Sequence, residues 1–232
     1  MRQDDRMSVV LSRAEYFAMW SQLHGGIQPR GVVRGWLSLA HFLARPFFRL
    51  SPNAISSFSV VVAVAVAVHV RDGNHLLALD ALLVVAIGML DSLDGVVAVC
   101  TDRVTRWGAV LDSIADRTVD FLLVVMLVRV GASIPLAAIA LTASFVLEYM
   151  RARAQGLGVT EVTVITAGEK PTRIIIVAMF LLACGVIPDH WQLLSEIAIC
   201  VWLTVSAIGV VQLMRDYKKV LSSPDVRGHN LG

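Results

Sequence analysis

The sequence predicts an all-α integral membrane protein with six transmembrane helices and an N-terminal interfacial amphipathic helix. Three observations support this: a hydrophobic content of 56%, a mean hydropathy of +0.71, and long apolar runs separated by short polar segments. The charged content of 16% is low for a water-soluble domain. A single membrane domain is expected because little sequence remains outside the apolar runs.

The apolar runs define the expected helices, since a spanning helix needs about 20 mostly apolar residues. The six candidate spans are 54–70, 75–98, 107–130, 132–152, 171–188 and 192–214. Aspartates interrupt the second and third spans, and the first is short. We therefore expect an N-terminal segment with a juxtamembrane helix (1–50), a six-helix membrane domain (51–216) and a C-terminal tail (217–232).

The basic residues predict the orientation in the membrane. With six spans, both termini lie on one side, and that side receives 17 of the 20 lysines and arginines. Because basic residues concentrate in cytoplasmic segments, both termini are expected in the cytoplasm. The segment between the second and third spans, which holds most of the aspartates, then also faces the cytoplasm.

The stretch GVVRGWLSLAHFLARPFFRL, residues 31–50, has an amphipathic pattern. Its arginines recur at steps of three and four with Ser38 and His41, and its large apolar residues fall on the other side. Such a helix is expected to lie in the membrane interface with its arginines toward anionic lipid headgroups. Pro46 is expected to kink or end it.

Polar and small residues mark one face of each of the two expected helices that flank the loop between the second and third spans. The spacing i, i+3, i+4, i+7 on one helix and i, i+4, i+8 on the next places each set on a single face. The two sets are Asp91, Asp94, Gly95 and Ala98, then Gly108, Asp112 and Asp116. A tight turn between antiparallel helices would bring the four carboxylates together.

Four adjacent carboxylates repel one another unless cations lie between them. Their hard oxygen ligands favour Mg²⁺, Mn²⁺ or Ca²⁺, and no His or Cys is interleaved to favour zinc. Two such ions can clamp phosphate oxygens, and a further carboxylate can take a proton from an attacking hydroxyl. Arg117 and Asp120, one turn apart, are interpreted instead as a structural ion pair.

These residues resemble the CDP-alcohol phosphatidyltransferase family, whose pattern is D-x2-D-G-x2-A-R-x8-G-x3-D-x3-D. Seven of its eight fixed positions match between Asp91 and Asp116. The segment SPNAIS at 51–56 also resembles the family's entry into its first span, and the resemblance extends over about residues 50–215. The departure is Val99, where the family has arginine.

The resemblance implies six helices around a cytoplasm-facing cavity, usually in a homodimer embedded among membrane lipids. The donor would be a CDP-linked lipid such as CDP-diacylglycerol, from which an alcohol displaces CMP. Two divalent ions, Mg²⁺ or Mn²⁺, would be held by carboxylates, with Asp116 also the catalytic base. By carry-over the metal ligands are Asp91, Asp94, Asp112 and Asp116. The nucleotide-binding residues are Asn53, Asp91, Asp94, Gly95, Ala98 and Gly108.

Two of these positions leave alternatives open. Asn53 could instead be the N-cap of the first span. Val99 supplies no positive charge beside the nucleotide, so either Arg103 or Arg106 could substitute for the missing arginine, or the chain could be a non-catalytic member.

The segments EYMRARAQGLG (148–158) and EKPTRIIIV (169–177) resemble the phosphatidylinositol-phosphate synthase branch of this family. Arg151, Arg153, Lys170 and Arg173 would form an anion pocket for the acceptor, because arginine and lysine bind phosphate. Inositol phosphate is the first choice of acceptor and glycerol phosphate the second. Glu148 and Leu213 depart from this branch, and a carboxylate at 148 could favour an amine or polyol.

A second class of function is a membrane transporter or ion-binding protein, because intramembrane carboxylates also mark ion pathways. That class predicts charges spread through the membrane depth or repeated broken helices. Here the aspartates gather at one interface. No nucleic-acid partner is expected.

Overall fold

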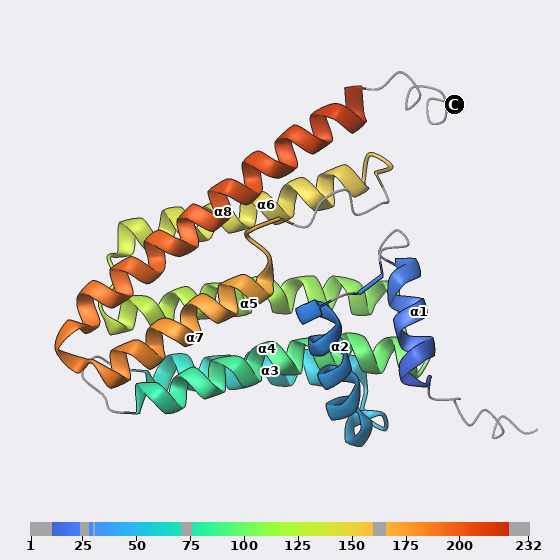
Figure 1. Cartoon of the computed structure of the whole chain (residues 1–232), viewed down its shortest axis with the longest axis horizontal. Coiled ribbons are helices and arrows are strands. Elements are labelled where there is room, and N and C mark those ends of the chain that lie inside the picture. The colour runs from blue at the N-terminus through green and yellow to red at the C-terminus, as the bar shows by residue number, and fades with distance from the viewer. Residues whose placement is uncertain (1–10, 24–27, 30, 71–75, 160–165, 223–232) are drawn as a thin grey trace, which may run out of the picture. The chain divides into compact units, whose positions relative to one another are not determined.

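The computed structural model describes residues 11–23, 28–29, 31–70, 76–159 and 166–222 (Figure 1). All regular elements in these ranges are helices. The N-terminal elements are α1 (Arg13–Leu23), α2 (Gly31–Ala44) and the 3₁₀ turn η1 (Arg45–Phe47). The long helices are α3 (Pro52–His69), α4 (Leu77–Cys100), α5 (Arg106–Val130), α6 (Ile134–Gln155), α7 (Lys170–Val186) and α8 (Trp191–Ser222), with η2 (Pro188–His190) before α8.

Six long helices therefore lie where the six spans are predicted. Four segments are long and apolar enough to cross a membrane: 52–69, 77–100, 134–155 and 188–222. Helix α5 carries six charged residues, and α7 has 17 residues, so neither meets the same measure. In its described residues the chain is all-helical, and its long apolar helices are those of a membrane protein. Most of the predicted tail, residues 223–232, and the first ten residues lie outside the described ranges.

The chain divides into two compact units. Unit 1 comprises residues 1–70 and 79–126, and unit 2 comprises residues 71–78 and 127–232. Unit 1 therefore contains α1 to α3 and most of α4 and α5, whereas unit 2 contains α6 to α8.

In unit 1, the two N-terminal helices pack beside the carboxyl-terminal half of α4 (Figure 1). Tyr16 of α1 and Ala40 of α2 share a buried apolar cluster with Val97 of α4. Trp36 of α2 donates to the Ser92 hydroxyl of α4 over 3.1 Å. These contacts fix the end of α4 that carries the aspartates.

Helix α1 is absent from the predicted elements, although a short motif marks its start. The backbone N–H of Ser12 donates to the Glu15 carboxylate at 2.7 Å, and the N–H of Glu15 donates to the Ser12 hydroxyl at 3.4 Å. This reciprocal pair is a capping box, which satisfies backbone donors at a helix N-terminus. The hydrogen bonds from Ser12 lower the pKa of Glu15.

The N-cap of helix α3 is Ser51 and not Asn53. Ser51 is the N-cap, and its side chain accepts a hydrogen bond from the backbone N–H of Ala54 at 3.2 Å. Pro52 follows at the first helical position, where its missing N–H costs nothing. The N-cap interpretation of Asn53 is therefore wrong, and its side chain remains available for the site.

A tight turn joins α4 to α5. The N–H of Arg103 donates to the Ala98 carbonyl at 2.9 Å, and the N–H of Asp102 donates to the Val99 carbonyl at 3.4 Å. This is the Schellman pattern of a helix C-terminus, with Asp102 in the left-handed conformation at φ 52°. Thr105 then caps α5 by accepting from the N–H of Gly108 at 2.9 Å. The short connection makes the two acidic helices neighbours.

In unit 2, α6 and α7 both pack against α8. Trp202 of α8 is fully buried and donates to the Ser144 hydroxyl of α6 at 2.7 Å. Ser144 and Ser206 lie 3.0 Å apart through their hydroxyls, so each buried polar group in this contact has a partner. The packing positions the end of α6 beside the start of α7.

Candidate active site

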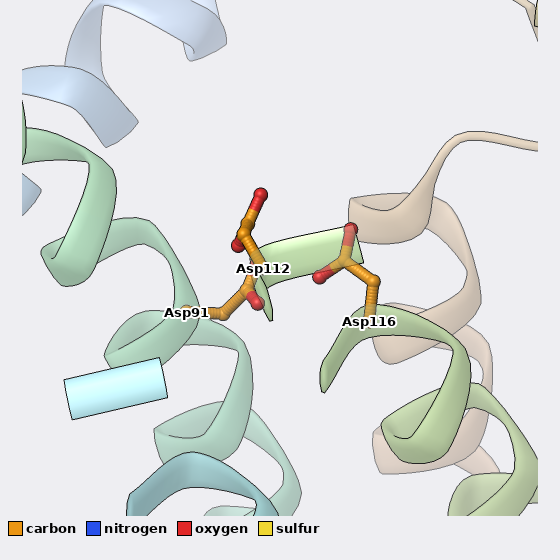
Figure 2. Close-up of side chains that lie close together, drawn as sticks. All are labelled: Asp91, Asp112 and Asp116. Atoms are coloured by element: carbon orange, nitrogen blue, oxygen red, sulfur yellow. The ribbon is translucent and has the colours of Figure 1, made fainter. Parts of the chain in front are cut away.

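Three of the four predicted metal ligands converge. Asp91 of α4 and Asp112 and Asp116 of α5 each offer a carboxylate oxygen, and these oxygens lie within 4.8 Å of one another. Figure 2 shows the three side chains directed toward a common point. Oxygens bound to one Mg²⁺, Mn²⁺ or Ca²⁺ ion at 2.0–2.6 Å are separated by up to about 5 Å, so this donor set fits a hard divalent cation.

Asp94 lies on the same face of α4 but outside this group of three. Its carboxylate is buried and accepts a short hydrogen bond from the Ser56 hydroxyl of α3. The Pro52 carbonyl lies 3.2 Å from the same hydroxyl and is the weaker alternative acceptor for its one proton. Asp94 therefore connects α4 to α3, and the spacing of the motif alone does not reveal this serine.

Beside the carboxylates, unit 1 contains a cavity of about 190 Å³ between α3, α4, the turn and α5. Five of the six predicted nucleotide-binding residues line it: Asn53, Asp94, Gly95, Ala98 and Gly108. Asp112 lines it as well, so one residue belongs both to the cavity and to the carboxylate group. The sixth residue, Asp91, lies in the carboxylate group only.

The two glycines of the cavity differ in what surrounds them. A Cβ atom on Gly108 would lie 2.9 Å from the Thr105 hydroxyl and 3.2 Å from the Asn53 side-chain oxygen. Glycine at 108 therefore permits the close approach of these two polar side chains. A Cβ atom on Gly95 would meet nothing within 4 Å, so glycine at 95 leaves open space.

Val99 occupies the position where the family pattern has arginine, and it lines the cavity. Arg103 lines the same cavity. The Arg103 guanidinium donates to the Leu50 carbonyl at 3.1 Å, which holds it at the cavity wall. Arg106, the other candidate substitute, is not among the lining residues. The geometry therefore favours Arg103 as the source of positive charge in the cavity.

Arg117 lies at the edge of the carboxylate group. Its guanidinium is 3.5 Å from the Asp120 carboxylate, which confirms the predicted ion pair, and 3.6 Å from that of Asp116. The arginine therefore also brings positive charge to one member of the proposed metal site.

In unit 2, two predicted acceptor-binding arginines contact carboxylates. Arg151 donates to both oxygens of Glu169, at 3.0 Å to one and by a shorter bond to the other, and to the Thr166 hydroxyl at 2.9 Å. Glu148 lies 3.4 Å from Arg151 and 3.3 Å from Arg173. Arg151, Arg173, Glu148 and Glu169 thus form one cluster of alternating charge, which we call the Arg–Glu cluster.

The other two predicted acceptor residues lie differently. Lys170 is the first residue of α7, next to Glu169. Arg153 lines a separate cavity of about 370 Å³ between α6 and α8, together with Tyr149 and Lys218. Two residues along a helix turn the side chain by about 200°, so Arg151 and Arg153 face different directions.

Comparison with protein families identifies the group to which this site belongs. The family model described as CDP-alcohol phosphatidyltransferase matches residues 49–210, which includes α3 to α7, the carboxylate group and the cavity. The chain belongs to the CDP-alcohol phosphatidyltransferase family. It is an enzyme of phosphatidyl transfer, and the transporter alternative is not supported.

Similar members of the family come from archaea and bacteria. The chain is 32% identical over 173 residues to an archaetidylinositol phosphate synthase of Aeropyrum pernix, covering 72% of this chain and 84% of that protein. It is 30% identical over 189 residues to that of Methanothermobacter thermautotrophicus, covering 81% and 91%. A phosphatidylinositol phosphate synthase of Mycobacteroides abscessus is 31% identical over 183 residues, covering 76% and 80%.

Two solved structures of the Mycobacterium tuberculosis phosphatidylinositol phosphate synthase are similar in fold. The structure with bound CDP-DAG has a TM-score of 0.63 and 26% identity, covering 84% of this chain and all of that chain. The structure in complex with manganese and citrate has a TM-score of 0.62 and 27% identity, covering 81% and 91%. The family fold thus extends over most of the sequence.

Proposed function

We propose that this enzyme transfers the phosphatidyl group of CDP-diacylglycerol to the hydroxyl of inositol phosphate and releases CMP. The observation that carries the proposal is the convergence of Asp91, Asp112 and Asp116 beside a cavity lined by the family's nucleotide motif. The relatives named as inositol phosphate synthases, and the related structure with CDP-DAG, support the choice of both substrates.

The metal site is assigned to Asp91, Asp94, Asp112 and Asp116. Three of them offer convergent oxygens, and Asp94 has one oxygen oriented by Ser56. When bound, divalent cations would neutralise charge on the phosphate oxygens of the donor. The related structure in complex with manganese makes Mn²⁺ a natural first choice for assays, with Mg²⁺ beside it.

Asp116 is assigned as the base. Its carboxylate accepts the proton of the acceptor hydroxyl, whose oxygen forms a bond to the phosphorus that carries the diacylglycerol. The bond from that phosphorus to the oxygen of CMP breaks, and CMP leaves with the electron pair. The Arg117 guanidinium lies 3.6 Å from this carboxylate, at the edge of the site.

The cavity of unit 1 is assigned to the cytidine nucleotide. Gly95 leaves open space there, and Gly108 allows Asn53 to approach. Arg103 would supply the positive charge that Val99 does not, since both line the same cavity. On this assignment the chain is catalytic despite the departure at 99.

The acceptor site is assigned to Arg151, Lys170 and Arg173, at the junction of α6 and α7. Arginine can bind phosphate through two parallel hydrogen bonds, which suits a phosphorylated alcohol. Arg153 is left out of this site because it lines the separate cavity between α6 and α8. Glycerol phosphate stays the second choice of acceptor.

We further propose that all six long helices, 52–222, span the membrane, with both termini and the active site in the cytoplasm. The asymmetry of the basic residues supports this orientation. Helix α2 is assigned to the interface as a separate N-terminal segment because of its amphipathic sequence pattern, and its end at Ala44 agrees with the break expected at Pro46. A homodimer is proposed on the family resemblance and can be tested by cross-linking in membranes.

The test is CMP release by the purified protein from CDP-diacylglycerol with Mg²⁺ or Mn²⁺. We expect release with inositol phosphate and much less with glycerol phosphate or unphosphorylated inositol. Asp116→Asn should reduce release at least about a hundredfold, because the proton acceptor is lost. No release by the wild-type protein with any acceptor would refute the proposed activity.

A matched control separates loss of the base from a general effect of removing charge. Asp102 is an exposed aspartate of the same unit in the turn between α4 and α5, and asparagine tolerates its left-handed conformation. Asp102→Asn should retain normal release. Equal losses in Asp102→Asn and Asp116→Asn would remove the specific assignment of Asp116.

A further inference from the structure

The Arg–Glu cluster contains as many carboxylates as guanidinium groups. Arg151 and Arg173 are held by Glu148 and Glu169. A phosphate that approaches these arginines therefore meets two acids already in contact with them. Since a like charge disfavours an incoming anion, the two carboxylates must differ in role if the arginines are to bind an acceptor.

Glu169 has the contacts of a structural partner. It engages Arg151 through both oxygens, and it accepts from the backbone N–H of Thr166 at 2.8 Å and from the Thr166 hydroxyl at 2.9 Å. Glu169 is also the N-cap residue of α7. These bonds tie the segment before α7 to the end of α6, so displacing Glu169 would open that junction.

Glu148 has looser contacts and is shared. Its oxygens lie 3.3–3.5 Å from the guanidinium nitrogens of Arg151 and Arg173, longer than the 2.7–2.9 Å of a strong charge-assisted bond. Its side chain is 23% exposed, whereas that of Arg173 is fully buried. Glu169 and Arg151 are exposed to a similar degree, so it is the longer contacts of Glu148, not its exposure, that mark it as the member of the cluster that a rotamer change can remove.

We propose that Glu148 is a placeholder for the acceptor's phosphate, a specificity-determining carboxylate that is displaced when the acceptor binds. In the absence of acceptor it neutralises the buried Arg173, which would be costly to leave without a counter-charge. In the presence of a phosphorylated acceptor, the dianionic phosphate competes with the single charge of Glu148 for both arginines. The residue thereby sets a threshold that favours strongly anionic acceptors.

This inference rests on the proposed function, since it assumes that Arg151 and Arg173 bind the acceptor. It predicts opposite effects for the two carboxylates. Glu148→Gln removes the competing charge but keeps a polar partner, so the KM for inositol phosphate should fall about three- to tenfold. Glu169→Gln, the matched control, weakens the junction of α6 and α7, so the same KM should rise and the thermal midpoint should fall.

A second measurement does not depend on turnover. Inorganic phosphate should raise the thermal midpoint of Glu148→Gln more than that of the wild-type protein, because the site no longer holds an internal anion. Glu148→Ser, which introduces a small polar residue, should likewise lower the KM for inositol phosphate and increase the stabilisation by phosphate. It serves as the test variant if Glu148→Gln does not fold.

The outcomes separate this inference from the proposed function. An unchanged or raised KM in both Glu148 variants, with active wild-type protein, would overturn the placeholder role and leave Glu148 as a positioning residue. If the wild-type protein shows no turnover, the proposed function fails. The phosphate measurement then tests only whether Glu148 excludes an anion from these arginines: this part stands if phosphate stabilises the Glu148 variants more than the wild type, and falls if it does not.

Discussion

The carboxylate group of α4 and α5 and the Arg–Glu cluster of α6 and α7 use charge in opposite ways. In the first, three like charges from two helices offer oxygens within 4.8 Å of one another. In the second, acids and bases alternate, and Glu148 bridges two arginines. Gathering like charges is unfavourable in the protein alone, whereas alternating charges stabilise it.

This difference determines how the stability of each region depends on a bound ligand. A site that collects like charges gains its stability only when an oppositely charged ligand arrives, so it is expected to depend on divalent cations. A cluster that is balanced internally is stable without ligand and must exchange one partner to bind another. Removing a charge should therefore change the stability of the two regions with opposite signs.

The largest effect is expected at Asp112, which belongs to the carboxylate group and lines the nucleotide cavity. Asp112→Asn should reduce CMP release at least about a hundredfold, because a metal ligand is lost. The metal-free variant should also melt at a higher temperature than the metal-free wild type, because a like charge is removed. A lower melting temperature would contradict the view that these carboxylates repel one another.

Removing a charge from the Arg–Glu cluster should lower the stability of the protein rather than raise it. Arg173 is fully buried, so Arg173→Met leaves Glu148 without one of its two arginines and should destabilise the protein by up to about 3 kcal/mol. Thermal unfolding in detergent without substrate measures the change. Equal or greater stability in the variant would show that the cluster contributes no net stabilisation.

The two cavity glycines sharpen the comparison within unit 1. Gly108→Ala forces a methyl group against the Thr105 hydroxyl and the Asn53 side-chain oxygen and should cost about 1–3 kcal/mol. Gly95→Ala has open space, so it should fold normally but raise the KM for CDP-diacylglycerol severalfold by filling the cavity. Thermal melts and CMP release measure both variants, and similar behaviour of the two would remove the distinction between packing and binding.

The smallest effect is expected at the capping box of α1. Ser12→Ala should reduce helix stability by about 1 kcal/mol and increase hydrogen exchange across residues 13–23. Because the pKa of Glu15 is lowered in the folded protein, its contribution is present at neutral pH and is lost as the pH falls through that pKa. Exchange in α1 should therefore increase at acidic pH, and this increase should be smaller in Ser12→Ala.

Much of the architecture is predictable from local patterns. The apolar runs locate the six long helices, and the three- and four-residue spacing of the aspartates places Asp91, Asp112 and Asp116 on faces that converge. The end of α2 before Pro46 follows from the geometry of proline. The start of α1 is also marked in the sequence, because Ser12 and Glu15 have capping-box spacing.

The remaining features depend on helix rotation or on tertiary contacts. Arg151 and Arg153 are neighbours in the sequence, but the rotation of about 200° between them separates their side chains. The bond between Ser56 and Asp94 and the contacts of Arg151 with Glu169 join residues 38 and 18 positions apart, so no local pattern reveals them. Both contacts are decided by how helices pack rather than by any one segment.

The turn from Thr101 to Thr105 affects which insertions and deletions the enzyme can tolerate during evolution. Each residue added to or removed from a continuous helix rotates the downstream part of that helix by about 100°. If one residue were inserted into or deleted from α5 before Asp112, the side chains of Asp112 and Asp116 would rotate away from Asp91, although every acidic residue would still be present. The left-handed Asp102 and the cap at Thr105 therefore fix where α5 begins, and a single-residue insertion inside α5, between this cap and Asp112, should be among the least tolerated in the chain.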